Sequence, residues 1–300
     1  MKEPANRLFA GIVLISAAGF FWGSMGTAVQ YLFSLGGFEP VSLVEMRLMS
    51  AGLILLAAAT ALNRRATWGV WKDRKDGRDA VVSGFLLFAS HETFFEAIYY
   101  SNAGTAAILL TLVPLFAALW LALLGKRRLH AVEGLCFVLA TAGVALIITD
   151  GDFGSLKFSP LALAWGLTSA VCATGYSVQP VRVIAKCGVF PVVTWGTFFG
   201  GLFASLFAQP WNAGAVWDLA SVGAFAYIVL FGTIIAFAAF LAGLKYVSPV
   251  IAGLLNCMEP LSAIFCSMLL LGDVMGTWQA AGVALVLSNV VLIALGRRSA

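Results

Sequence analysis

Long apolar stretches separated by short polar connections fill almost the whole chain. Each stretch is close to the 20 or so apolar residues that a helix needs to cross the hydrocarbon core of a bilayer. Apolar residues run on without a break instead of alternating with polar ones, which favours helices over the strands of a barrel. The pattern predicts an all-α integral membrane protein with ten transmembrane helices. The predicted spans are 8–33, 38–62, 79–101, 103–125, 130–149, 160–182, 189–209, 219–243, 248–271 and 276–296.

Composition supports a membrane protein and excludes several other classes. Of the 300 residues, 61% are hydrophobic and 11% are charged, whereas about a quarter of a soluble domain is charged. The longest connections, 63–78 and 149–159, leave no room for a soluble domain. The five cysteines form no C-x-x-C pair, and no G-x-x-x-x-G-K-[ST] loop occurs. We therefore expect no metal, no cofactor and no direct use of ATP.

The positions of lysine and arginine predict the orientation in the membrane. If the N-terminus is cytoplasmic, all 18 of these residues except Lys157 and Arg47 fall on the cytoplasmic side. Such a bias is the positive-inside pattern, and it requires an even number of spans. We expect a bacterial-type inner (plasma) membrane protein with both termini in the cytoplasm. The net charge of +4 then reflects topology and does not indicate nucleic-acid binding.

The chain also resembles itself at a separation of about 145 residues. Trp22-Gly23 in the first predicted span matches Trp165-Gly166 in the sixth, and the block 100–115 matches 246–261. The repeat predicts two units, 1–150 and 151–300, with five spans each. Because five is odd, the second unit enters the membrane from the opposite side, and such inverted repeats are typical of transporters that alternate between inward-open and outward-open states.

Four motifs carry a resemblance to a known family. They are Trp22-Gly23, the Pro40…Arg47 pattern, the Tyr100-Ser101-Asn102-Ala103-Gly104…Pro114 block and its counterpart Tyr246-Val247-Ser248-Pro249…Met258-Glu259-Pro260. With these motifs the chain resembles the EamA-type branch of the drug/metabolite transporter superfamily. The resemblance implies ten helices as two inverted five-helix repeats, and an exporter or exchanger of small metabolites. It does not specify the substrate. One departure is Lys126, where the family often has an acidic residue.

Ionisable residues within spans are rare, and each is a candidate for function. The candidates are Glu45, Arg47, His91, Glu92, Glu96 and Glu259. At 1.5 Å per helical residue, Glu92 lies roughly 15 Å and Glu259 roughly 16 Å from a helix end. Both therefore fall near the midplane, where transporters bind their substrates. We expect at least one of the two to bind a proton or to contact a cationic group of the substrate.

Arg47 and His91 have simpler interpretations. Arg47 is expected to pair with Glu96 at a similar depth. His91-Glu92 begins like H-E-x-x-H, but Phe95 stands where the second histidine should be. His91 is therefore interpreted as a hydrogen-bonded core residue, with a proton relay as the alternative.

Three aromatic residues are further candidates. Trp22 and Trp165 occupy matched positions of the repeat, and together with Tyr99 they are candidates to contact a substrate in a central cavity. The alternative is packing or interfacial anchoring, which is the common role of aromatics in membrane proteins.

Two prolines are candidate hinges. Pro260 is expected to free a backbone carbonyl near Asn256 and to let the helix bend, and Pro114 does the same in the first unit. Val113 stands where the second unit has Glu259. The site is therefore expected to be asymmetric.

We interpret the chain as a secondary active transporter of a small polar metabolite, such as an amino acid or amine, with proton coupling as an option. The alternatives are a membrane-embedded enzyme or a passive channel that uses Glu92, Glu96 and His91. The expected partners are the small-molecule substrate and the lipid bilayer, with a homodimer left open.

Overall fold

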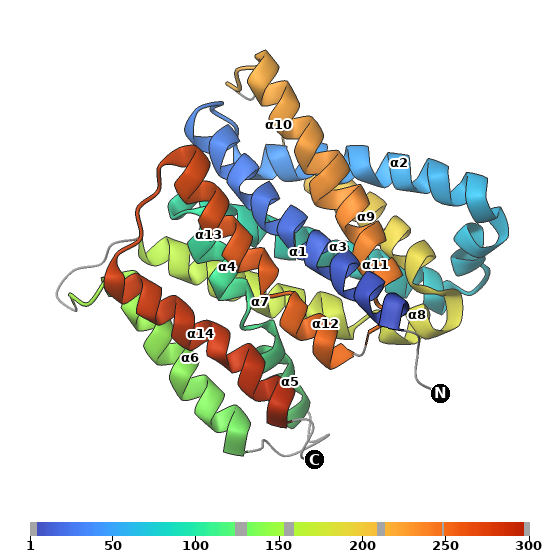
Figure 1. Ribbon diagram of the computed structural model, residues 1–300. Helices are drawn as coiled ribbons and strands as arrows, with labels where there is room; N and C mark the ends of the chain where they lie inside the picture. The colour runs from blue at the N-terminus through green and yellow to red at the C-terminus, as the bar shows by residue number, and fades with distance from the viewer. Residues whose placement is uncertain (1–4, 124–130, 153–158, 209–213, 248, 297–300) are drawn as a thin grey trace.

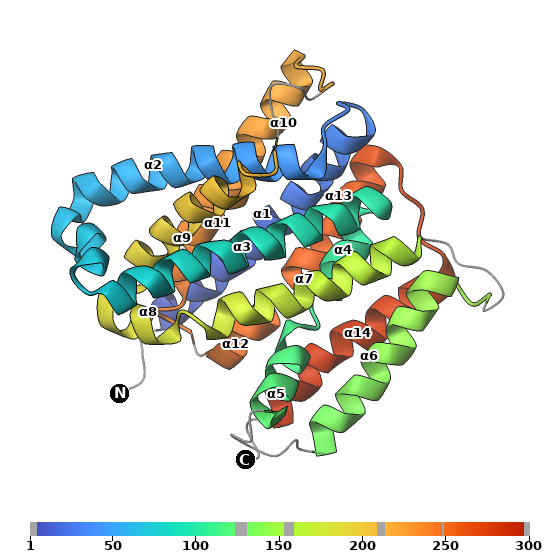
Figure 2. The same ribbon diagram turned by 180° about the vertical axis from the view of Figure 1, so that it is seen from behind.

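The computed structural model describes residues 5–123, 131–152, 159–208, 214–247 and 249–296. These residues form helices joined by short connections, and the described part of the chain contains no strand (Figure 1, and from behind in Figure 2). The helices of the first half are α1 (Ala5–Ser34), α2 (Pro40–Gly69), η1 (Val70–Lys72), α3 (Arg74–Tyr100), α4 (Ala103–Leu110), α5 (Val113–Leu123) and α6 (Ala131–Thr149). Those of the second half are α7 (Pro160–Val178), α8 (Val181–Cys187), α9 (Val189–Ala204), α10 (Leu219–Val229), η3 (Leu230–Ile235), α11 (Ala236–Gly243), α12 (Pro249–Leu255), α13 (Met258–Leu271) and α14 (Thr277–Gly296).

The helices have the length and composition of a multi-pass membrane protein. Among the described residues, six helical segments are long and apolar enough to span a bilayer: Arg7–Ser34, Pro40–Lys72, Arg74–Tyr100, Ala103–Leu123, Pro160–Cys187 and Leu219–Gly243. Four shorter apolar helices accompany them: Gly134–Thr149, Val189–Ala204, Met258–Leu271 and Thr277–Ser288. The described part of every predicted span is thus mostly helical, while the count of ten crossings stays a prediction.

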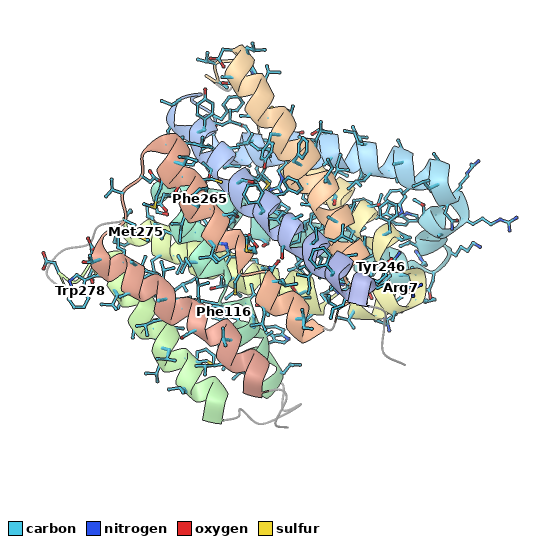
Figure 3. All side chains as sticks on the ribbon, in the orientation of Figure 1. Arg7, Phe116, Tyr246, Phe265, Met275 and Trp278 are labelled. Atoms are coloured by element: carbon cyan, nitrogen blue, oxygen red, sulfur yellow. The ribbon has the colours of Figure 1, made fainter. Side chains whose placement is uncertain are left out.

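Large apolar side chains cover the outside of the bundle, as contact with lipid requires. Phe265 on α13 and Trp278 on α14 lie on the outer surface, with 62% and 55% of their side chains exposed (Figure 3).

Two of the predicted spans are broken near their middle. α4 ends at Leu110 and α5 begins at Val113, while α12 ends at Leu255 and α13 begins at Met258. Each break lies just before a proline, Pro114 or Pro260, which has no N–H to donate to the carbonyl four residues earlier and whose ring clashes with that carbonyl. The chain crosses each break in a tight turn. The hinge candidates therefore coincide with real breaks, and their motion stays a prediction.

Two further elements differ from the predicted continuous helices. The predicted span 38–62 continues as helix to Gly69, with a kink at Asn63 (φ −154°, ψ 79°). The predicted span 219–243 contains a π-helix, Leu230–Ile235. Such wide turns inside α-helices are frequent at functional sites.

Glycines let the helices approach closely around the centre. A Cβ on Gly23 of α1 would overlap the carbonyl oxygen of Glu259 on α13. Between α2 and α9, a Cβ on Gly52 would lie 2.7 Å from Cα of Phe198, and one on Gly201 would lie 2.6 Å from the backbone nitrogen of Met49. Small residues at helix crossings are the usual means of packing inside membranes. They bring α1 close to α13, which carries Glu259, and α2, which carries Arg47, close to α9.

Much of the charge on which the predicted orientation depends lies outside the described residues. This holds for Lys2, Lys126, Arg127, Arg128, Lys157, Arg297 and Arg298. It also holds for Ser248, the predicted helix end that lies eleven residues before Glu259. The described cations Arg7, Arg64, Arg65, Lys72, Arg74, Lys75, Arg78, Arg182, Lys186 and Lys245 lie at helix ends or in connections.

Candidate functional site

Arg47 on α2 is the centre of the candidate site. Its side chain is fully buried, with 0% exposed. Nε donates to the hydroxyl of Thr233 (2.9 Å), and Nη1 contacts Nδ1 of His91 (3.2 Å). The guanidinium carbon lies 5.5 Å from the ring centre of Phe95, a distance at which the ring attracts a cation. Helices α2, α3 and η3 thus converge on one arginine.

One nitrogen of this guanidinium has no partner. Nη2 of Arg47 is buried and makes no hydrogen bond to the described residues. A buried donor on a charged group is costly when it is left unpaired. The site therefore presents one unused donor of a fixed cation.

The π-helix positions Thr233 toward Arg47. The hydroxyl of Thr233 donates to the carbonyl of Ile228, five residues earlier (2.9 Å). Because its proton is used in this way, the hydroxyl oxygen can accept from Nε of Arg47. The sequence analysis missed Thr233. Its only signal was that it is the single hydroxyl residue between 228 and 243 of an apolar span.

The contact with Arg47 defines the state of His91. A guanidinium can only donate hydrogen bonds, so Nδ1 of His91 must accept and its proton must be on Nε2. The imidazole is then neutral in this arrangement. The hydrogen bond expected of a core histidine is present, and the alternative role as a proton relay is not tested by it.

The predicted ion pair between Arg47 and Glu96 is absent from the described ion pairs. The helical repeat of α3 explains this, because residues four apart share a face. His91 and Phe95 form the face toward Arg47, while Glu92 and Glu96 form the next face, about 100° further round. The carboxylate that interacts electrostatically with Arg47 is Glu259 on α13, without a direct ion pair.

The other candidate acids, Glu92, Glu96 and Glu45, are partly buried. Oε2 of Glu92 is buried and makes no hydrogen bond within the described part of the chain, and the charged neighbour of Glu92 is Glu96. Glu96 and Glu45 are half-buried. Glu45 is two residues from Arg47, so it lies about 200° round α2 and faces elsewhere.

The break between α12 and α13 places Glu259 and Asn256 one turn apart. The carbonyl of Asn256 accepts from the backbone N–H of Glu259 (3.0 Å). The expectation of a free carbonyl near Asn256 is therefore wrong, because the tight turn supplies the donor that Pro260 lacks. The unpaired group is instead the side-chain oxygen Oδ1 of Asn256, which is buried.

The aromatic candidates lie in three different environments. Trp22 packs against Phe237 and Phe240 of α11, with ring centres 5.4 and 5.2 Å apart. Trp165 is half-buried against the core formed by α1, α2 and α3. Tyr99 is 51% exposed at the end of α3. The structure therefore does not bring Tyr99 into contact with the Arg47 cluster.

The comparison with known proteins decides the family. The model of the EamA-like transporter family matches the chain twice, over residues 9–149 and 160–295. The chain belongs to the EamA-like transporter family. The two matches give this EamA-like transporter two family segments, each of which contains one of the broken helices.

Individual relatives of this EamA-like transporter agree with the assignment. The uncharacterized inner membrane transporter YicL of Salmonella typhimurium is 32% identical over 289 residues, covering 96% of both chains. The uncharacterized inner membrane transporter YedA of Escherichia coli is 24% identical, covering 92% of this chain and 88% of the relative. Protein PecM of Dickeya dadantii is 24% identical, covering 85% and 83%.

A solved crystal structure supports the fold. It aligns with a TM-score of 0.64 at 20% identity and covers 97% of this chain and 98% of its own. The family and these names indicate a multi-pass membrane transporter, and they argue against the alternative of a membrane-embedded enzyme.

Proposed function

We propose that the protein is a secondary active transporter that moves a small zwitterionic metabolite, such as an amino acid, by alternating access. Ten spans form two inverted five-helix units, 1–150 and 151–300, in the inner membrane with both termini cytoplasmic. Three observations support this arrangement: the double family match, the bias of lysine and arginine, and the two helix breaks, whose flanking helix ends are each 145 residues apart.

The unpaired Nη2 of Arg47 is the observation that carries the proposal. Thr233 accepts from Nε and His91 accepts from Nη1, so Nη2 is the nitrogen that remains available to an acceptor on a ligand. A substrate carboxylate would supply that acceptor, because charged oxygen is the strongest partner of a guanidinium. Arg47 would then select substrates with a carboxylate.

The acids around Arg47 would hold the amino group of the same substrate. Glu259 interacts electrostatically with Arg47 and lies at a helix break, and Glu92 has a buried oxygen without a partner. A carboxylate that remains buried needs a cation or a proton to neutralise it. Substrate and proton would therefore compete for the same groups, which is one basis for coupling transport to a proton gradient. A substrate that is an amine without a carboxylate would use the acids alone.

The broken helices supply the movement. α13 carries Glu259 and packs on α1 through Gly23, while α4 packs beside α13 (Figure 1). Bending at the break would move Glu259 relative to Arg47 on α2. The two states would then differ in the separation of these opposite charges.

A flux assay in proteoliposomes tests the proposal. Radiolabelled amino acids and their decarboxylated amines are supplied outside, and exchange with unlabelled substrate inside is measured. Saturable exchange without chemical change supports a transporter, a converted product would indicate an enzyme, and flux that does not saturate would indicate a channel.

Arg47 variants test the role of the guanidinium. Arg47→Gln is expected to lower the flux of carboxylate substrates about ten- to hundredfold, the effect of losing a hydrogen bond to a charged group. Arg47→Lys keeps the charge and controls for loss of the fold, and Lys245→Gln removes an exposed cation as a matched control. Undiminished amino-acid flux in a folded Arg47→Gln protein would refute the role of Arg47.

A further inference from the structure

The segment between the apolar parts of α2 and α3 combines exposed cations with exposed tryptophans. We call the residues Arg64, Arg65, Trp68, Trp71, Lys72 and Arg74 the basic patch. All six are exposed, Trp68 by 46% and Trp71 by 40% of the side chain.

The kink at Asn63 gives this segment its own orientation. Asn63 leaves the helical conformation and its side chain accepts from the N–H of Ala66 (3.0 Å), which starts the helix again. In the helical turns after the kink, one face carries residues at helical spacing, namely Arg64, Trp68, Trp71 and Lys72. The opposite face carries Thr67 and Val70, which are buried. The cations and tryptophans of the basic patch therefore share a surface.

Trp195 of α9 packs against both exposed tryptophans of the basic patch. Trp195 is buried and lies 5.1 Å, centre to centre, from both Trp68 and Trp71. Its indole N–H donates to the carbonyl of Thr67 (2.8 Å). The basic patch thus needs little ordering before it binds a ligand.

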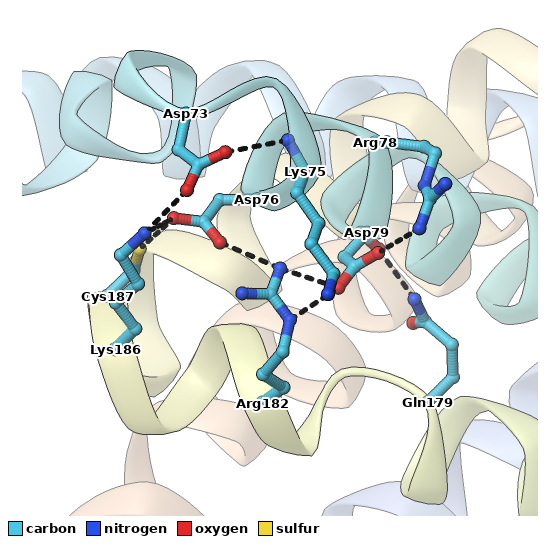
Figure 4. A network of polar contacts seen from close by, with 9 residues as sticks. All are labelled: Asp73, Lys75, Asp76, Arg78, Asp79, Gln179, Arg182, Lys186 and Cys187. Atoms are coloured by element: carbon cyan, nitrogen blue, oxygen red, sulfur yellow. Dashed lines mark hydrogen bonds and ion pairs between the residues drawn. The ribbon is translucent and has the colours of Figure 1, made fainter.

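Nearby acids do not neutralise the basic patch, because the second half of the chain pairs with them. Figure 4 shows Asp73, Asp76 and Asp79 near Arg182 and Lys186 of α8 and Gln179 just before it. Asp76 is paired with both Arg182 (2.8 Å) and Lys186 (2.5 Å). Lys186 also pairs with Asp73, and Arg182 with Asp79, both at 2.8 Å. No ion pair of Arg64, Arg65, Lys72 or Arg74 is found among the described residues.

We propose that the basic patch binds the headgroups of anionic phospholipids in the adjacent leaflet. It forms the end of the candidate span Pro40–Lys72, directly after the predicted apolar span 38–62, and this position corresponds to headgroup level, where tryptophan is enriched. Four uncompensated cations match the negative charge of such lipids, and each lysine or arginine near an anionic surface changes binding about fivefold. The proposal does not depend on the proposed transport function.

Native mass spectrometry of the full chain in detergent tests the proposal. Dioleoylphosphatidylglycerol or dioleoylphosphatidylcholine is titrated, and binding constants are taken from the lipid-bound peaks. The wild-type protein is expected to prefer phosphatidylglycerol. The double variant Arg64→Gln/Arg65→Gln is expected to lose about twenty-five-fold in that preference, as the effect of two cations.

Arg7→Gln/Lys245→Gln is the matched control, because it removes two exposed cations at another place. Arg7 lies beside Tyr246, the neighbour of Lys245 (Figure 3). Melting curves confirm that both double variants are folded. An equal loss of the preference for phosphatidylglycerol in the two double variants would overturn the proposal. The preference would then depend on the total charge of the protein and not on the basic patch. Displacement of the lipid by an equal concentration of inorganic phosphate would also overturn it, because the site would then be one for small anions.

Discussion

Replacing Thr233 with valine tests how the π-helix supports Arg47. Valine has nearly the same shape, so the change removes the hydroxyl and little else. The hydroxyl accepts from Nε of Arg47 and donates to the carbonyl of Ile228, both at 2.9 Å. Thr233 itself is fully buried at 0% exposure, so water does not replace either partner.

The expected loss follows from these two bonds. A hydrogen bond to a charged group contributes about 1.5–3 kcal/mol, and measured values between helices in membranes average about 0.6. Because Nη2 of Arg47 is already unpaired, Thr233→Val would leave two of its donor nitrogens without partners. We expect Thr233→Val to lower the free energy of unfolding by about 2–3 kcal/mol.

Thr233→Ser is the control, since it keeps the hydroxyl and removes only one methyl group, at about 1 kcal/mol. Unfolding in mixed detergent and flux in proteoliposomes are measured for both variants. Transport by Thr233→Val should fall more than its stability alone explains, because Arg47 loses its orientation. If valine and serine variants unfold and transport alike, the hydroxyl does not hold Arg47 and this account of the site is wrong.

Three further predictions follow from the helix packing, the ion pairs and the charge bias. Gly23→Ala should abolish folding or transport, because its Cβ meets the backbone of Glu259, whereas Gly223→Ala has open space and should be neutral in melting curves. The hydrogen bond from Lys186 lowers the pKa of Asp73, so this contact stabilises the protein above the unfolded pKa of about 3.9 and is lost as the pH falls through the lower folded value. Melting of Asp73→Asn across pH should lack that loss. The proposed topology is tested by cysteine labelling in a cysteine-free background. Leu35→Cys, at a position 70% exposed, should react with an impermeant thiol reagent added outside, and Lys75→Cys should not. Reaction of Lys75→Cys would contradict the proposed orientation.

The apolar pattern could predict where helices lie because a bilayer imposes a length and excludes unpaired backbone groups. Pro114 and Pro260 likewise predicted where two helices break, since the missing N–H is a local property. The π-helix has no such local cause in the sequence, and Thr233 was therefore missed. Thr233 gains its place in the site only through the hydrogen bond from Arg47, which belongs to another helix.

The prediction that Arg47 pairs with Glu96 was wrong for a related reason. Counting residues gives depth along a helix and says nothing about its rotation against a neighbour. Glu96 and Phe95 lie at almost the same depth, but they differ by about 100° in direction. Only the packing of α2 against α3 decides that Phe95 faces Arg47.

The distribution of charge between the two family segments connects the repeat with the site. Both segments contain a broken helix, but Glu259 in the second has Val113 as its counterpart in the first. Conversely, α9, which is the counterpart of α2 in the proposed repeat, carries no charge to match Arg47. The cation thus comes from one segment and the acid at the break from the other. If the segments move against each other, the separation of Arg47 and Glu259 must change, and a zwitterion or a proton that binds between them is bound differently in the two states.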